Sequence, residues 1–142
     1  MAAIRRTPAD AAFSHCIRER ADWTCERCGK YFPPDSNRRG LHASHFYGRR
    51  HKGLRFHTSN CFSHCYKCHQ TLGENPADFA LWVENHIGSG MYEIIRERKN
   101  SIYKMEKNEL AEIADHYRQE LKNMEQRRAE GAVGYLNFLS WY

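Results

Sequence analysis

The sequence predicts a single α+β domain in which a cysteine-rich middle segment without helical periodicity is flanked by helices. Residues 8–20 and 76–130 carry apolar side chains at helical spacing, whereas residues 23–64 carry repeated turn signals instead. A length of 142 residues with 41% hydrophobic residues suits one domain with its own core. We expect four parts: an N-terminal helix over 1–22, a cysteine- and histidine-rich core over 23–75, a helical region over 76–130 and an aromatic tail over 131–142.

The expected helices are bounded by local signals. Thr7 suits an N-cap, Pro8 suits the first helical position and Asp10 follows the cap by three residues, which predicts a helix over 8–20. Further helices are expected between Pro76 and Gly88, over 91–99 and over 108–130. The last carries an apolar stripe that packs either on the domain or on a partner helix: Leu110, Ile113, Tyr117, Leu121 and Met124.

The middle segment predicts short strands rather than helices. We expect strands over 41–47 and 54–57, and a short helix that begins near Cys65 and ends near Gly73. The chain ends in YLNFLSWY, in which six of eight residues are apolar or aromatic. This tail either docks on the core or forms a contact surface.

Basic charge is concentrated in the first half of the chain. Residues 1–75 hold 13 Lys/Arg against 6 Asp/Glu, a net charge of +7, whereas the remaining residues hold 9 against 11. No acidic residue occurs between Ser36 and Gly73. An acid-free basic segment predicts a polyanionic partner, most often nucleic acid. The basic side chains of this segment are Arg38, Arg39, Arg49, Arg50, Lys52, Arg55 and Lys67.

The distribution of apolar residues argues against a membrane protein. No apolar run approaches the length that spans a bilayer, and no apolar stretch follows the arginines near the N-terminus as in a secretory signal. We therefore expect a cytoplasmic protein with no membrane partner. Disulfides are rare in that compartment, so the six cysteines indicate metal binding.

Two CxxC pairs, Cys25–Cys28 and Cys65–Cys68, predict a structural zinc site. Two intervening residues allow both thiolates of a pair to reach one ion from a tight turn. Two pairs supply the four sulfur ligands of a tetrahedral zinc site. Four thiolates leave no position open for a substrate, so this ion should stabilise the fold.

The residues between and beside these pairs resemble a known nuclease family. His45 on a strand, Asn60 five residues before the second CxxC, and His69 directly after it resemble the HNH motif. AFSHCIRERADWTCERCGK, LHASHFYGRR and LRFHTSNCFSHCYKCHQTLGEN further resemble the NinG or Rap recombination endonucleases of lambdoid phages. The resemblance covers roughly residues 11–130. It implies a ββα-metal (HNH, His-Me finger) core tied by zinc, with flanking helices.

The resemblance also implies roles for particular residues. His45 would be the general base, His69 would ligate a catalytic Mg²⁺ or Mn²⁺ ion with His42, and Asn60 would belong to the catalytic motif. We expect Asn60 to pin the hairpin loop through backbone hydrogen bonds. Many family members carry Asp or His where this chain has Ser44, and NinG-like proteins usually carry Asn where it has His69. The residues expected to grip DNA phosphates are Arg49, Arg50, Lys52 and Arg55.

These features predict a metal-dependent DNA endonuclease, encoded by a phage or prophage and active in the host-cell cytoplasm. The resemblance implies branched recombination intermediates, such as Holliday junctions or D-loops, as substrates. Paired incisions at a junction favour a two-fold homodimer, which the last helix and the anchors Tyr135, Phe138 and Trp141 would form. Two alternatives stay open: a non-catalytic zinc-stabilised nucleic-acid-binding module, favoured by the serine at position 44, and a sequence-specific HNH nickase.

Overall fold

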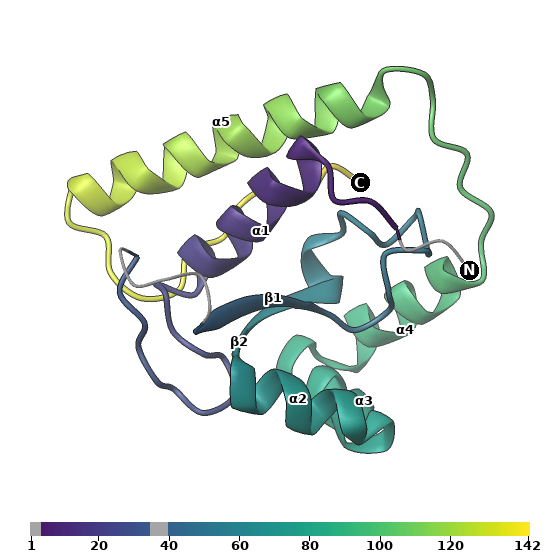
Figure 1. Ribbon diagram of the computed structural model, residues 1–142, viewed down its shortest axis with the longest axis horizontal. Coiled ribbons are helices and arrows are strands. Elements are labelled where there is room, and N and C mark those ends of the chain that lie inside the picture. The colour runs from purple at the N-terminus through teal and green to yellow at the C-terminus, as the bar shows by residue number, and fades with distance from the viewer. Residues whose placement is uncertain (1–3, 35–39) are drawn as a thin grey trace.

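The computed structural model describes residues 4–34 and 40–142, over which the chain forms five α-helices and one two-stranded sheet (Figure 1). The mixed α and β class is therefore as predicted. None of the helices in these ranges is both long and apolar enough to cross a membrane. The elements follow in the order α1 (Pro8–Arg20), β1 (Leu41–His45), the 3₁₀ helix η1 (Thr58–Asn60), β2 (Cys61–Cys65), α2 (Tyr66–Glu74), α3 (Pro76–Ile87), α4 (Ser89–Lys99) and α5 (Glu109–Ala129).

The hairpin of β1 and β2 separates two hydrophobic cores. The strands pair antiparallel, with His42 opposite His64 and His45 opposite Cys61. Cys61 faces α1 and α5, and Phe62 faces α2, α3 and α4. In Figure 1, α1 and α5 lie on one side of the hairpin and α2 and α3 on the other. Because both faces are covered, all five residues of β2 are buried.

Local signals place the ends of α1 and α3 where they were expected, whereas α4 begins at Ser89 and not at residue 91. Thr7 and Asp10 form a capping box at the start of α1, which spans the predicted Pro8–Arg20. Pro76 opens α3, and Gly88 ends it at a φ of 86°. A positive φ of this kind favours glycine because it has no Cβ.

The strand predicted over 54–57 is wrong, because these residues form turns and not an extended pair. The amides of Leu54 and Arg55 both donate to the carbonyl of His51. Leu54 packs in the core beside α3, whereas Phe56 packs in the core beside α1. The partner of β1 is Cys61–Cys65, and β1 ends at His45 rather than at residue 47.

The apolar stripe of α5 and the aromatic tail pack within the chain. Ile113, Tyr117 and Met124 are buried against α1, so core packing is confirmed for this helix face. The tail runs back alongside α1 (Figure 1), where the Leu136 amide donates to the Arg20 carbonyl at 3.0 Å. Phe138 and Trp141 pack against the same core. Of the expected dimer anchors, Phe138 and Trp141 thus pack within the chain, whereas Tyr135 is 54% exposed, and the homodimer stays a prediction.

Candidate functional site

The four predicted cysteine ligands meet at one point. The Sγ atoms of Cys25, Cys28, Cys65 and Cys68 all lie within 4.8 Å of one another. A tetrahedral zinc ion with Zn–S bonds of about 2.3 Å requires sulfurs about 3.8 Å apart. The Cys28 and Cys65 sulfurs lie 3.8 Å apart. The cluster therefore fits a zinc ion and joins the first CxxC turn to the end of β2 and the start of α2.

A buried charge network fastens the first CxxC turn to the outer edge of β2. The Ser63 amide donates to the Glu26 carboxylate at 2.6 Å, and the Glu26 amide donates to the Ser63 carbonyl at 2.7 Å. His86 and Arg20 flank the same carboxylate at 2.8 and 3.8 Å. Burial alone would raise the pKa of Glu26, but these partners lower it below its usual value. The edge of the sheet is thus covered by a carboxylate that stays ionised.

His45 lies at the end of β1, on the face of the hairpin that meets α1. Its Nε2 lies 2.9 Å from the Arg55 carbonyl oxygen. A carbonyl only accepts, so Nε2 carries the ring proton and Nδ1, which lies 3.8 Å from the buried Cys61 Sγ, is the basic nitrogen. Burial lowers the pKa of His45 more than this hydrogen bond raises it. The imidazole is therefore neutral near pH 7, the state in which a histidine accepts a proton.

A cavity of about 210 Å³ opens beside His45, between α1 and the segment that follows β1. Arg6, Asp10, Ser14 and Arg49 line it together with His45. Two arginines and a proton-accepting imidazole around one cavity suit a phosphate group and a water molecule. The cavity is the place where the chain brings a neutral histidine and two arginines together.

Asp10 holds the wall of this cavity in place. Its carboxylate accepts hydrogen bonds from Arg55 at 3.0 and 2.5 Å, and Arg49 lies 3.7 Å away. Burial would raise the pKa of Asp10, but the hydrogen bonds from Arg55 and Thr7 lower it. The Arg55 guanidinium is buried in this pair. Arg55 is therefore engaged inside the fold rather than presented to a DNA phosphate, although its carbonyl orients His45.

Asn60 pins the loop between the strands, as expected. Its side chain accepts from the Tyr47 amide at 2.9 Å and donates to the carbonyls of Tyr47 and Leu54 at 2.9 and 3.0 Å. Its exposed fraction is 0%, so these bonds satisfy the amide inside the protein. Asn60 supports the loop that carries Arg49 and Arg55 and does not line the cavity beside His45.

The histidines expected to hold a catalytic ion lie on the opposite face of β1 from His45. The rings of His42 and His69 stack with centroids 5.5 Å apart, and His69 Nδ1 lies 3.0 Å from Ser44 Oγ. The enclosed His42 Nε2 has no hydrogen-bond partner within residues 4–34 and 40–142. Among the described residues, no carboxylate joins these two imidazoles in a metal-binding group. Within those ranges, the four cysteines are the only set of three or more Asp, Glu, His or Cys side chains close enough together to bind one metal ion.

The remaining basic residues lie on the turn after β1. Arg50 and Lys52 are exposed, and Arg49 is half-buried with a hydrogen bond to the Ile4 carbonyl at 3.1 Å. Arg38 and Arg39 lie outside the described residues. The sequence did not predict that Arg6, Asp10 and Ser14 line the cavity beside His45. No local signal in the sequence shows that α1 packs against the turn that carries Arg49.

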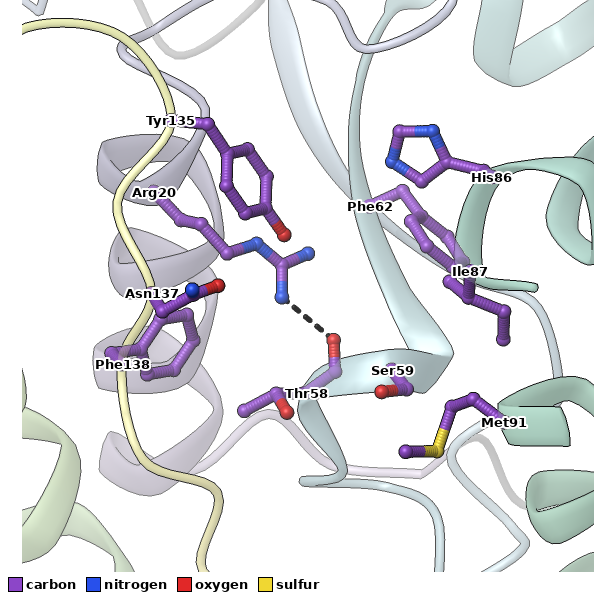
Figure 2. Close-up of a pocket in the computed structure, with 10 residues that line it drawn as sticks. All are labelled: Arg20, Thr58, Ser59, Phe62, His86, Ile87, Met91, Tyr135, Asn137 and Phe138. Atoms are coloured by element: carbon purple, nitrogen blue, oxygen red, sulfur yellow. Dashed lines mark hydrogen bonds between the residues drawn. The ribbon is translucent and has the colours of Figure 1, made fainter.

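A larger cavity of about 420 Å³ lies away from His45 and the cysteines (Figure 2). Arg20, Tyr135, Asn137 and Phe138 form one wall, and Phe62, His86, Ile87 and Met91 face them. The Arg20 guanidinium points at the Thr58 carbonyl, to which it donates at 2.7 Å. Arg20 is also paired with Glu26, so this cavity offers no uncompensated charge for a phosphate.

Comparison with known families shows a match over most of the chain. The family model described as Bacteriophage Lambda NinG protein matches residues 6–128. This range includes the four cysteines, both strands, His45, Asn60 and His69. Searches of curated proteins and of solved structures gave no significant match.

Proposed function

The chain belongs to the bacteriophage Lambda NinG family, and from this premise we propose that it is a metal-dependent DNA endonuclease. Its substrates are branched recombination intermediates such as Holliday junctions and D-loops. The observation that carries the proposal is the hydrogen bond of 2.9 Å between His45 Nε2 and the Arg55 carbonyl, beside a cavity that Arg6 and Arg49 also line. A DNA-binding module needs cationic side chains, but it does not need an oriented neutral histidine.

The reaction follows from the protonation state of His45. His45 Nδ1 takes a proton from a water molecule while the water oxygen forms a bond to phosphorus. The ester bond to the leaving oxygen breaks, and that oxygen takes a proton from solvent. Arg49 and Arg6 neutralise the charge that builds on the non-bridging phosphate oxygens. Burial of His45 keeps it neutral and ready to accept the proton at pH 7.

His42 and His69 are the residues that would hold the catalytic divalent ion. The unpartnered His42 Nε2 supports this assignment, as does the contact of His69 Nδ1 with Ser44, which leaves His69 Nε2 for a ligand role. Such an ion would supply positive charge to DNA phosphate on the face of β1 opposite His45. Ser44 then orients His69 and need not be a ligand itself. Two imidazoles alone are a poor ligand set for Mg²⁺, which prefers carboxylate and water oxygens.

The proposal is tested by incubating the protein with labelled four-way, three-way and linear duplex DNA in Mg²⁺, Mn²⁺ or EDTA. We expect cleavage of the branched substrates with a divalent ion and none in EDTA. The structural zinc should stay bound in mild EDTA, because four thiolates close its coordination shell. Binding of all three DNAs without cleavage under any ion would instead favour the non-catalytic binding module.

A further inference from the structure

A second cationic cavity lies on the other side of the turn from His45. The turn after β1 and the C-terminal end of α4 enclose about 170 Å³. Its lining includes four cationic side chains, Arg50, Lys52, Arg98 and Lys99, together with His51 and Ser101. No carboxylate is among the described residues that line it. None of the four cations forms an ion pair with a described acidic residue.

Arg98 is held in place without using its terminal amino groups. Its Nε donates to the Gly53 carbonyl at 2.5 Å, and its guanidinium carbon lies 4.4 Å from the centroid of the Tyr142 ring. A Cβ on Gly53 would lie 3.3 Å from Tyr103 Cβ, so the turn approaches this segment closely. Neither terminal nitrogen of Arg98 has a hydrogen-bond partner in the described part of the chain. The guanidinium is thus oriented before any ligand arrives.

The charged side chains around this cavity are all positive. Burial lowers the pKa of His51, and the neighbouring Arg50 and Lys99 lower it further. Like charges held together without counter-charges favour an anion, and arginine and lysine together recognise phosphate. The sequence predicted DNA binding for two of these cations, Arg50 and Lys52. The other two, Arg98 and Lys99, lie on α4 and were not predicted to bind DNA.

The two cavities flank a single turn. Arg49 lines the cavity beside His45, whereas its neighbour Arg50 lines the second cavity. A DNA backbone that crosses the turn therefore meets both. We propose that the second cavity binds a phosphate of the DNA substrate that is not cleaved, an inference that rests on the proposed endonuclease function. Its occupation fixes the position of the backbone relative to His45.

The test compares DNA binding by two double variants in EDTA, where no cleavage occurs. Arg50→Gln/Lys99→Gln removes two exposed cations from the cavity. Arg118→Gln/Lys122→Gln removes the same charge from the exposed face of α5. Fluorescence anisotropy with a four-way junction gives Kd over a series of KCl concentrations. Circular dichroism checks that both variants are folded.

We expect the cavity variant to raise Kd by about tenfold per lost contact and to reduce the slope of log K against log [KCl] by about one to two. The α5 variant should stay within about twofold of the unmodified protein, because scattered surface charges contribute little. Equal Kd and slope for both double variants would overturn the proposal. Saturation of the cavity by micromolar inorganic phosphate would overturn its assignment to DNA.

The outcome separates this inference from the proposed function. Loss of affinity in the cavity variant, together with an unmodified protein that cleaves no DNA, supports the phosphate site and contradicts the nuclease. Cleavage by the unmodified protein, together with unchanged binding by the cavity variant, contradicts the phosphate site alone.

Discussion

Replacement of Asp10 by asparagine tests how the fold builds the cavity beside His45. Asp10 and Arg55 are 7% and 8% exposed and share two hydrogen bonds. An amide keeps the shape of the carboxylate but not its charge, so Asp10→Asn leaves the Arg55 guanidinium buried without compensation. Loss of one partner of a buried pair costs about 3–5 kcal/mol. Arg49, 3.7 Å from the same carboxylate, adds repulsion in the variant.

Urea unfolding at pH 7 measures this cost in Asp10→Asn, in Arg55→Met and in the double variant. We expect the double variant to lose less stability than the sum of the single variants, because removal of both partners leaves no uncompensated charge. Asp115→Asn is the control, since Asp115 pairs with Arg118 at the surface and should cost at most about 1 kcal/mol. A cost below about 1 kcal/mol for Asp10→Asn, or strict additivity, would refute the reasoning.

The same pair predicts a pH dependence. The pKa of Asp10 is lowered in the folded protein from its usual 3.8, so its ionised form stabilises the fold at every pH above that value. The contribution is lost as the pH falls below 3.8 towards the lowered pKa. The stability difference between the unmodified protein and Asp10→Asn should therefore be constant from pH 7 to 5 and shrink below pH 4.

Three further predictions concern the zinc cluster, the loop and the tail. Cys65→Ser should remove the zinc, measured as one ion per chain by elemental analysis, and unfold the hairpin region, because zinc binding in such sites contributes about 10 kcal/mol or more. Asn60→Ala should destabilise the protein by about 3 kcal/mol in urea unfolding, since three buried hydrogen bonds are lost. Truncation after Gly131 should lower the melting temperature or render the chain insoluble, because Leu136 and Phe138 pack in the core. A stable, monomeric truncated chain would contradict this.

Helix boundaries were predictable because their causes are local. The capping box of Thr7 and Asp10 and the Pro76–Gly88 interval lie within a few residues of the ends that they set. The second strand was not predictable, because both its faces are buried and Cys61–Cys65 shows no alternation of apolar and polar residues. Residues 54–57 do alternate, but Leu54 and Phe56 enter different cores.

The candidate site was predictable where spacing in the sequence determines it. Two CxxC pairs fix the four-cysteine cluster, and the order of His45, Asn60 and His69 places them on the hairpin and α2. Contacts between residues far apart in the sequence could not be predicted, because no motif spacing marks them. Arg55 looked like one more exposed cation, yet it pairs with Asp10, 45 residues earlier. Arg98 joins Arg50 through the packing of α4 on the turn.

The most direct test of the endonuclease proposal is single-turnover cleavage of a four-way junction by His45→Gln. Glutamine can still donate a hydrogen bond to the Arg55 carbonyl, but it cannot accept a proton as imidazole does. His116→Gln is the matched control, since His116 lies on α5 and bonds the Leu139 carbonyl. We predict that His45→Gln binds the junction and keeps its zinc but cleaves about 10²–10⁴-fold more slowly, while His116→Gln cleaves normally. Cleavage by His45→Gln at the unmodified rate would contradict the account.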